Sequence, residues 1–407
     1  MIIEAINFYI IGYPIILSVF WITGSLLNKL QTKYLEKEAN KIEDEIEPSV
    51  AILVPGYNEE LNIKAVVSSL NEIEYKNIII YLIDDCSTDQ TLKKMYELKE
   101  KYLGKQKIEV IALPANGGKA KALNYTLKLI ETDYVVVIDA DSMISSDSIS
   151  YLVNRLESNP KLGAVTGRPI VRNRATMLAR IQTMEYLGII GNIKEAQNFF
   201  FNGIMTVSGV IVAYRTKALE TISGFDEKTM TEDINATWKL YQNKWDVGYE
   251  SRATTWILVP DTIRGLYRQR KRWAIGGLEV CIENMKKIRS FDWSKKMMLL
   301  ENVASHVWSW LFIIATVNYF VNMIIFKDFK FNGNILLLFF VIGVLQFGMG
   351  QLFSQTDDKL TFRDKLVFPI YLLVYWLVNL VTSVASEYVV FLKGTDEGKW
   401  ESSDRGL

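Results

Sequence analysis

The chain has 407 residues with 46 basic and 46 acidic side chains, and it contains one histidine and two cysteines. The zero net charge argues against a protein that binds nucleic acid through a uniformly basic surface, so we expect no nucleic-acid partner. His306, Cys86 and Cys281 are too few for a histidine-rich zinc site, a Ser-His-Asp triad or a disulfide framework. Carboxylates, lysines, arginines and hydroxyls are left for any chemistry.

Four segments contain no Asp, Glu, Lys or Arg and are long enough to cross a membrane: residues 5–28, 302–326, 331–356 and 366–386. About 20 apolar residues span a hydrocarbon layer of roughly 30 Å. We therefore predict an N-terminal transmembrane helix at residues 1–28, C-terminal transmembrane helices within residues 302–392, and a polar tail at residues 393–407.

The residues after the first apolar segment indicate the side of the membrane on which the chain continues. Lys29, Lys33, Lys37 and Lys41 lie in a charged linker, residues 29–47. The positive-inside rule places such a linker in the cytoplasm. No basic stretch precedes the segment and no small-residue cleavage site follows it, which favours a retained anchor over a signal peptide. Three further spans would place the tail outside, unless one segment is re-entrant or interfacial.

Residues 48–262 alternate short apolar runs with helical stretches, which predicts one α/β domain. The runs of strand length are Ser49–Pro55, Ile78–Asp84, Ile108–Pro114 and Tyr134–Asp139. Their continuous apolar character predicts strands buried on both faces, as in a mostly parallel sheet. Ligands of such sheets bind outside the carboxyl ends of the strands. The motifs GxGxxG and GxxxxGK[ST] are both missing from the sequence, so neither a dinucleotide enzyme nor a P-loop NTPase is favoured.

Polar residues follow the ends of these predicted strands and form the first candidate site. They are Glu59, Asp85, Lys119, Asp139 and Asp141. Asp139 and Asp141 can hold a divalent cation whose other ligands are diphosphate oxygens and water. Lys119 opens a predicted helix, where the helix amides and its ammonium group can both meet phosphate. The structural alternatives are that the acids end strands or cap helices and that Lys119 is an ordinary exposed lysine.

Two later motifs add further candidates. In Thr231-Glu232-Asp233, before a predicted helix, threonine can serve as N-cap, and a carboxylate at a helix N-terminus also stays ionised, as a general base must. In Gln269-Arg270-Lys271-Arg272-Trp273, two guanidinium groups can neutralise a diphosphate and the indole can stack on a sugar. Residues 263–296 carry a net charge of +7, which also suits a helix on an anionic membrane, so we assign residues 263–301 to basic interfacial helices.

The order of these motifs resembles that of processive family-2 glycosyltransferases, which include cellulose, chitin and hyaluronan synthases. The resemblance rests on five motifs: Tyr57-Asn58-Glu59, Asp84-Asp85, Asp139-x-Asp141, Thr231-Glu232-Asp233 and Gln269-x-x-Arg272-Trp273. Stretches at 160–167, 181–186, 256–263 and 403–406 are similar to bacterial poly-β-1,6-N-acetylglucosamine synthases. The chain departs from its relatives in having one N-terminal span and in having Ile275 where relatives often have glutamine.

The resemblance implies a GT-A fold, UDP-N-acetylglucosamine as donor, Mg²⁺ or Mn²⁺, inversion at the anomeric carbon and a growing polysaccharide as acceptor. It implies that Asp233 is the base, that Asp139 approaches the donor, that Asp141 and Asp139 hold the metal, and that Trp273 contacts the acceptor. The nucleotide and its diphosphate would be bound by Glu59, Asp85, Lys119, Gln269, Arg270 and Arg272. Ser208-Gly209 resembles the family's acceptor-channel turn. Membrane lipids, a small membrane accessory subunit and a bacterial cell membrane location are also implied.

Several alternatives stay open. A hyaluronan, chitin or cellulose synthase has the same motifs, and a single-transfer enzyme acting on a lipid phosphate has the same fold. A non-catalytic membrane scaffold with a degenerate nucleotide-sugar domain is the rival from another class. The Gln269-x-x-Arg272-Trp273 motif favours polymerisation, and the intact carboxylates favour catalysis. Aromatic residues of the C-terminal segments, such as Trp310, Tyr371 and Tyr375, can either line a sugar path or pack helices.

Overall fold

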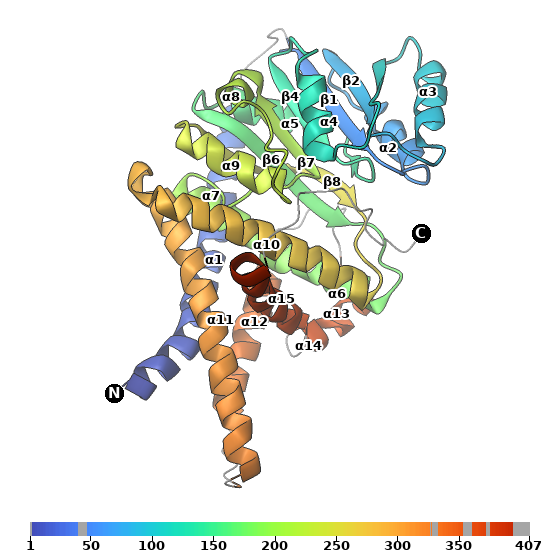
Figure 1. Ribbon diagram of the computed structural model, residues 1–407. Coiled ribbons are helices and arrows are strands. Elements are labelled where there is room, and N and C mark those ends of the chain that lie inside the picture. The colour runs from blue at the N-terminus through green and yellow to red at the C-terminus, as the bar shows by residue number, and fades with distance from the viewer. Residues whose placement is uncertain are drawn as a thin grey trace.

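The computed structural model describes residues 2–39, 47–325, 327, 333–352, 360–371 and 375–393. Within these ranges an α/β layer lies at one end, and long helices extend away from it (Figure 1). The predicted linker at 29–47 is described in part. The predicted tail at 393–407, including the motif at 403–406, lies outside the described residues except for Lys393.

One mixed sheet of eight strands organises the α/β layer, in the order β3-β2-β1-β4-β7-β6-β8-β5. The strands are β1 (Val50–Gly56), β2 (Ile78–Asp84), β3 (Lys107–Ala112), β4 (Tyr134–Ile138), β5 (Met143–Ile144), β6 (Leu162–Val171), β7 (Ile211–Arg215) and β8 (Asp246–Ile257). Strands β3, β2, β1 and β4 are parallel neighbours, as predicted for the four apolar runs. Strands β6 and β8 are also parallel, whereas β7 is antiparallel to β4 and β6 and β5 is antiparallel to β8. The sheet is therefore mixed, with four of its seven strand pairs parallel.

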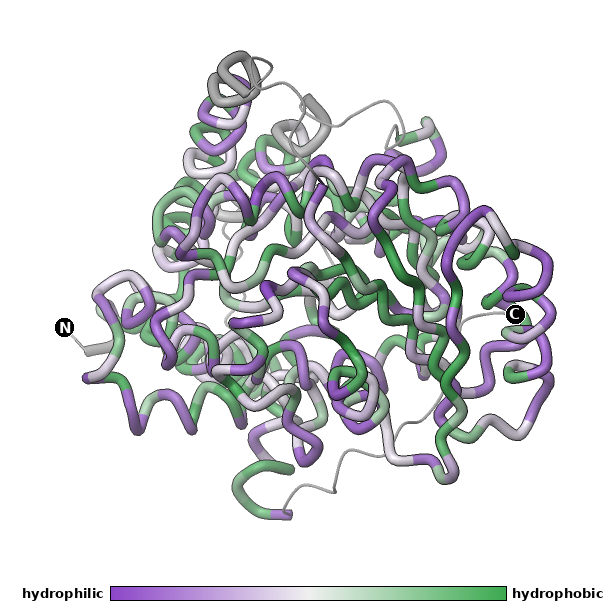
Figure 2. Tube along the Cα trace, turned by 90° about the horizontal axis from the view of Figure 1, so that it is seen from above, coloured by the Kyte–Doolittle hydropathy of each residue, from purple (hydrophilic) through white to green (hydrophobic). Residues whose placement is uncertain are grey.

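The continuous apolar sequence of β1 reflects burial on both faces of the sheet. Because successive side chains of a strand point to opposite faces, Ile52 and Val54 join one core and Ala51 and Leu53 join the other. The first core includes α2 (Ile63–Leu70), α3 (Thr91–Lys101) and α5 (Ser148–Glu157); the second includes α4 (Lys119–Leu127), α8 (Thr216–Thr221) and α9 (Glu232–Gln242). Figure 2 shows hydrophobic residues gathered along the central strands.

The remaining helices connect this layer to the long apolar segments. They are α1 (Ile2–Ala39), α6 (Met177–Glu185), the π-helical turn η1 (Tyr186–Ile190), α7 (Gly191–Phe201), α10 (Ile263–Lys286), the 3-10 turn η2 (Ile288–Ser290), α11 (Trp293–Ile325), α12 (Gly333–Leu352), α13 (Phe362–Leu366), α14 (Phe368–Ile370), α15 (Trp376–Tyr388) and the π-helical turn η5 (Val389–Lys393). Helix α10 lies along the underside of the α/β layer, between it and α11, α12 and α15 (Figure 1).

Two described helices are long and apolar enough to cross a membrane, judged by length and composition. They cover Glu4–Lys33 of α1 and Trp293–Ile325 of α11, and they contain the first two predicted spans. Helix α12 covers much of the third. The described part of the fourth, residues 366–386, is divided among α13, α14 and α15. Helix α15 continues directly into η5, so the described helical stretch here runs from Trp376 to Lys393.

Candidate active site

The loops after β1, β2 and β3 meet at one edge of the sheet. The register pairs Gly56, the last residue of β1, with Asp84, the last residue of β2. Both Asp85 carboxylate oxygens then accept backbone hydrogen bonds from the loop after β3, at 3.0 Å from Gly117 N and 2.8 Å from Gly118 N. Gly118 has φ 86, a left-handed conformation that favours glycine. Asp85 therefore holds the loop that presents Lys119.

This position bears on the predicted role of Asp85, which stays a prediction. The residue is 0% exposed, and burial raises the pKa of its carboxyl group. Glu59 is similarly enclosed, at 5% exposed, and its Oε2 accepts a 2.8 Å hydrogen bond from Asn62. Asp85 and Glu59 thus support the loops of the site, and nucleotide binding by either residue stays a prediction.

Lys119 is the centre of the candidate site. Its Nζ lies 2.6 Å from Asp139 Oδ1, at the end of β4, and 3.0 Å from Glu232 Oε1, at the start of α9. It also donates a 3.3 Å hydrogen bond to the carbonyl oxygen of Gly209. Burial alone would lower the pKa of Lys119, but the nearby carboxylates of Asp139, Glu232 and Asp233 raise it. A permanent cation therefore joins four segments that are distant in the sequence.

Asp233 lies beside this cluster and is held by two backbone amides. Its Oδ2 accepts a 3.0 Å hydrogen bond from Gly209 N, and its Oδ1 accepts a 2.9 Å bond from Ile234 N. A Cβ added to Gly209 would lie 2.9 Å from Lys119 Nζ and 3.3 Å from Asp233 Oδ2. A side chain at position 209 would therefore displace the Lys119 ammonium group and crowd the Asp233 carboxylate.

The two acids of the Thr231-Glu232-Asp233 motif have pKa values shifted in opposite directions. Burial, and then the charge of Glu232, raises the pKa of Asp233. Burial acts in the same direction on Glu232, but the ammonium group of Lys119 more than offsets it and lowers the pKa of Glu232. Neighbouring acids with separated pKa values are typical of sites in which one accepts a proton and the other stays ionised.

Asp139 and Asp141 have the donor set expected for a divalent cation. Asp141 is 6% exposed. Burial of Asp139 raises the pKa of its carboxyl group, Lys119 opposes this shift, and the negative charge of Asp141 adds to it. The two carboxylates therefore lie close together. Among the described residues no group of three or more His, Cys, Asp or Glu is arranged to hold a metal. Two carboxylates suit Mg²⁺ or Mn²⁺ because such ions take further oxygens from substrate phosphates and water.

Helix α10 places the Gln269-x-x-Arg272-Trp273 motif next to the start of α9. The Arg272 guanidinium donates a 3.4 Å hydrogen bond to the carbonyl oxygen of Met230, and its charge contributes to the lowered pKa of Glu232. Gln269, Arg272 and Trp273 share a face, since residues three and four apart lie on one side of a helix. In Gln269, Oε1 is buried and has no hydrogen-bond partner among the described residues. This face of α10 therefore adjoins the Lys119 cluster.

Arg270 lies on another side of α10 from Arg272, and its predicted contact with diphosphate stays a prediction. Residues two apart on a helix point about 200° apart, so Arg270 and Arg272 point in different directions. The Arg270 guanidinium lies 2.6 Å from Glu185 Oε2 and 4.6 Å from the centre of the Trp273 ring. Tyr375 of the C-terminal helices donates a 3.0 Å hydrogen bond to the same Glu185 oxygen. Arg270 thus joins α10 to α6 and to the C-terminal helices.

Two residues of these networks were not predicted from the sequence. Glu185 lies in the stretch 181–186, on which the resemblance partly rests, and Lys194 follows in α7, but neither residue was assigned a role. Lys194 is 7% exposed and donates a 2.5 Å hydrogen bond to Ser208 Oγ, next to Gly209. The signal available in the sequence was a charged residue among the apolar residues of the stretch 178–201.

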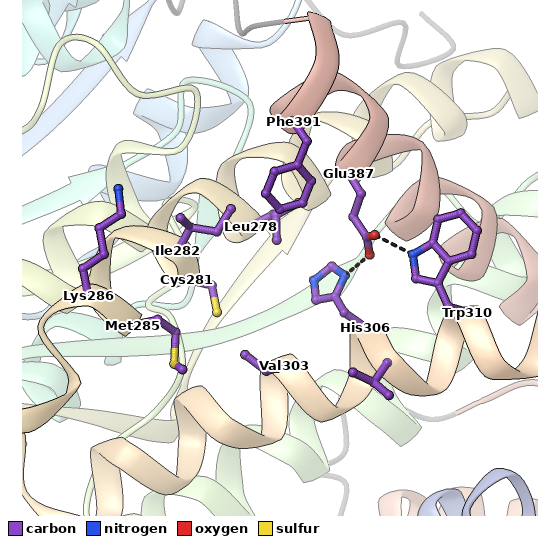
Figure 3. A pocket seen from close by; sticks show the side chains of 11 residues that line it. Leu278, Cys281, Ile282, Met285, Lys286, Val303, His306, Trp310, Glu387 and Phe391 are labelled. Carbon is purple, nitrogen blue, oxygen red and sulfur yellow. Dashed lines mark hydrogen bonds and ion pairs between the residues drawn. The ribbon is translucent and has the colours of Figure 1, made fainter. Parts of the chain in front are cut away.

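A second concavity lies away from this site, between α10, α11 and the end of α15 (Figure 3). It has a volume of about 550 Å³ and a mostly apolar lining that includes Leu278 and Ile282. Three of its polar side chains bind one another: His306 Nδ1 lies 2.7 Å from Glu387 Oε1, and Trp310 Nε1 donates a 2.5 Å hydrogen bond to Glu387 Oε2. The single histidine therefore lies outside the cluster of carboxylates and lysine.

Comparison with known proteins identifies relatives along the whole chain. The family model described as "Glycosyltransferase like family 2" matches residues 48–276. Poly-beta-1,6-N-acetyl-D-glucosamine synthase of Staphylococcus epidermidis is 32% identical over 412 residues, and that of Staphylococcus aureus strain COL is 31% identical over 409 residues. Each alignment covers 98% of this chain and 98% of the relative.

A solved structure shows the same fold. The mannosyltransferase PcManGT from Pyrobaculum calidifontis, in complex with GDP-Man and Mn²⁺, has a TM-score of 0.58 and 19% identity, covering 90% of this chain and 99% of that chain. This likeness establishes a GT-A-like fold, and the family match extends from before β1 to just beyond Trp273. The chain belongs to glycosyltransferase family 2, and it resembles poly-β-1,6-N-acetylglucosamine synthases over nearly its whole length.

Proposed function

We propose that the chain is a membrane-embedded, inverting glycosyltransferase that adds N-acetylglucosamine from UDP-N-acetylglucosamine to a growing poly-β-1,6-N-acetylglucosamine chain. The observation that carries this proposal is the cluster around Lys119, where the end of β4, the start of α9 and the Ser208-Gly209 turn meet. Donor and product are those in the names of relatives that align over 98% of both chains.

In the proposed reaction, a hydroxyl oxygen of the acceptor sugar attacks the anomeric carbon of the donor. A new glycosidic bond forms, the bond from the anomeric carbon to the phosphate oxygen breaks, and the electron pair leaves with UDP. Asp233 takes the hydroxyl proton, and its raised pKa makes it a stronger base than an ordinary aspartate. The amide of Gly209 holds this carboxylate in place.

The leaving diphosphate needs positive charge. Lys119, Gln269 and Arg272 are the residues we assign to it, with Trp273 against the acceptor sugar. Asp139 and Asp141 are the residues that would hold Mg²⁺ or Mn²⁺, which when bound would neutralise phosphate charge. The Mn²⁺ in the PcManGT complex supports a divalent cation for this fold.

We also propose that α1 and α11 anchor the enzyme in the bacterial cell membrane, with the catalytic domain in the cytoplasm and the C-terminal helices completing a multi-pass arrangement. Export of the polymer through these helices, and contacts with membrane lipids and a small accessory subunit, belong to the same proposal. Of the aromatic candidates for a sugar path, Tyr371 and Tyr375 stack on each other at 5.5 Å and are buried, which favours helix packing for this pair.

A donor comparison tests the proposal. Purified protein would be incubated with UDP-N-acetylglucosamine, UDP-glucose or UDP-glucuronate, with Mg²⁺, with Mn²⁺ or with EDTA, and UDP release and product linkage would be measured. We expect β-1,6-linked N-acetylglucosamine polymer, and none in EDTA. A different sugar or linkage would identify a hyaluronan, chitin or cellulose synthase. Single transfer to a lipid phosphate would refute polymerisation, and no UDP release from any donor would favour a scaffold. Polymer retained outside sealed inverted vesicles would refute export.

A further inference from the structure

Helix α7 carries a buried lysine that forms no ion pair. Lys194 is 7% exposed, no carboxylate of the described residues lies within ion-pair distance of it, and it donates its one hydrogen bond to Ser208 Oγ at 2.5 Å. Another buried lysine, Lys295 at 4% exposed, does form an ion pair, because its Nζ lies 3.0 Å from Asp246 Oδ1. A buried charge without a partner costs free energy of folding, so stability alone does not explain Lys194.

The Ser208-Gly209 turn connects Lys194 to the candidate base. Ser208 receives the hydrogen bond from Lys194, and the next amide, Gly209 N, donates to Asp233 Oδ2 at 3.0 Å. On the other side of the turn, the carbonyl oxygen of Gly209 accepts from Lys119 at 3.3 Å. The turn is thus held between two lysines, of which only Lys119 is paired with carboxylates.

The charge of Lys194 also acts on Asp233 directly. Burial lowers the pKa of Lys194 to about 8, and Asp233 is the acid whose charge opposes that shift. At neutral pH the ammonium form therefore predominates and favours the ionised form of Asp233. A perturbed, unpaired lysine next to a candidate base is typical of functional sites rather than of structural ion pairs.

We propose that Lys194 is a positioning residue of the acceptor side of the active site, which fixes the Ser208-Gly209 turn and, through it, keeps Asp233 oriented and ionised. The inference rests on the proposed role of Asp233 as the base. It adds a residue of α7 to a site otherwise built from strand ends, α9 and α10. Lys194 need not touch either sugar, because it acts through Ser208.

Other charged groups near Asp233 stay in place when Lys194 is replaced. The charges of Glu232 on the same helix and of Lys119 on α4 shift the pKa of Asp233. The charge of Asp233 in turn contributes to the raised pKa of Tyr214 on β7. Arg272 on α10 acts on Glu232. A change in the pH dependence of a Lys194 variant is therefore attributable to the missing ammonium group when these four residues are unchanged.

The test compares Lys194→Met, Lys194→Arg and Ser208→Ala in the full-length protein, with Lys295→Met as the buried-lysine control. For Lys194→Met we expect kcat to fall about 10- to 100-fold, the KM for UDP-N-acetylglucosamine to stay within about twofold, and the acid limb of the kcat profile to move to higher pH. Lys194→Arg keeps the acid limb of the wild type. Ser208→Ala lowers kcat without moving the limb, because the ammonium group remains.

Lys295→Met is expected to lose thermal stability while the folded fraction keeps the wild-type kcat and pH profile. Wild-type kcat and acid limb in Lys194→Met, or the same limb shift in Lys295→Met, would overturn the inference. If Lys194→Met does not fold, wild-type kcat in Ser208→Ala overturns it. Turnover by Asp233→Asn would instead overturn the proposed function. If Asp233→Asn is inactive while Lys194→Met keeps the wild-type kcat and acid limb, only the role of Lys194 is overturned.

Discussion

At the residue scale, Glu232 and Asp233 are adjacent in the chain yet differ in environment. Lys119 lies 3.0 Å from Glu232 Oε1, whereas Asp233 is bound by the amides of Gly209 and Ile234. Their pKa values consequently shift in opposite directions. The sequence motif alone, in which either acid suits the first turn of a helix, did not distinguish the ion-paired acid from the acid that we propose as the proton acceptor.

Replacement of Asp233 tests this distinction. Asp233→Asn keeps the size of the side chain and one of its two backbone hydrogen bonds, because only the amide oxygen accepts, but it removes the capacity to take a proton. We expect polymer synthesis to fall at least about 100-fold, the lower end of the contribution of a positioned base, and UDP binding to stay unchanged. Radiolabelled product and UDP binding to the purified variant are the measurements.

Asp226→Asn is the matched control for that experiment. Asp226 lies before the same helix and pairs with Lys239 at 3.0 Å, on a surface where both side chains are 30% exposed. We expect it to keep wild-type activity. Turnover by Asp233→Asn within a few-fold of the wild type would assign proton acceptance to another group.

Lys194 also gives a prediction about stability and pH. Its pKa is about 8 in the folded protein against an ordinary value of 10.5. Below about pH 8 it is protonated in both states, and the buried charge costs the folded state on the order of 3 kcal/mol. As the pH rises toward 10.5, the folded state releases its proton first and this cost disappears, so stability rises.

Lys194→Met should therefore unfold at a higher temperature than the wild type at pH 7, and the difference should shrink toward pH 10. Thermal denaturation in detergent at the two pH values measures this. Lys295→Met should instead be destabilised at pH 7, because it leaves Asp246 without its partner. Equal behaviour of the two variants would contradict an unpaired cation at position 194.

At the element scale, the continuous apolar runs in the sequence predicted β1 to β4, whereas β5 to β8 were missed. Strands β1, β2 and β4 lie within the sheet, where both faces are covered, and their residues are accordingly apolar. Strands β6 and β8 carry Thr166, Arg168, Glu250 and Arg252, so neither shows an uninterrupted run. Their place in the sheet depends on pairing between residues more than 80 positions apart, which local pattern does not contain.

The candidate site was predictable to a similar extent. Residues at the ends of parallel strands meet at one edge, so the grouping of Lys119 with Asp139 follows from the order of the strands. Arg270 and Glu185 depend instead on how α6, α10 and α15 pack. Only that packing shows which side of α10 faces the active site, and why Arg270 belongs to a buried ion pair.

The Glu185 network predicts a link between α6, α10 and α15. Glu185 accepts from Arg270 and Tyr375 at Oε2 and from Asn379 at Oε1, at 2.6, 3.0 and 3.0 Å. Glu185→Gln leaves the buried guanidinium without a countercharge, which costs about 3–5 kcal/mol. We expect a lower unfolding temperature in detergent and earlier protease cleavage near α15.

Glu283→Gln is the matched control, because Glu283 lies on α10 and pairs with Lys287 across one helical turn at 3.1 Å. The side chains of Glu283 and Lys287 are both about half exposed. Exposed pairs of this kind contribute less than about 0.5 kcal/mol, so its unfolding temperature should not change. Equal effects of the two substitutions would show that the Glu185 network does not hold the helices together.

At the scale of the whole molecule, the zero net charge of the chain conceals an uneven distribution of charge, because basic residues gather in α10. Helix α10, whose sequence contains several basic residues, lies between the α/β layer and the apolar helices (Figure 1). One face of α10 adjoins α9 through Arg272, and another contributes Leu278, Ile282 and Lys286 to the apolar pocket (Figure 3). The same helix therefore contacts both the candidate catalytic cluster and the region proposed to meet lipid.

This arrangement predicts opposite sides of the membrane for the catalytic domain and the far end of α11. The chain has two cysteines, of which Cys281 is buried and Cys86, in the loop after β2, is partly accessible. Lys327 follows α11 and is exposed. In intact cells, a membrane-impermeant maleimide should label Lys327→Cys and spare Cys86, because α11 would carry position 327 to the outer surface.

The wild type is the control, since it has Cys86 and no thiol at position 327. Its labelling should begin only after the membranes are opened, and peptide mapping by mass spectrometry should place the label at Cys86. Labelling of Cys86 in intact cells would put the catalytic domain outside, where a cytoplasmic nucleotide sugar does not reach it. Protection of Lys327→Cys until the membranes are opened would show that α11 turns back or lies along the cytoplasmic surface.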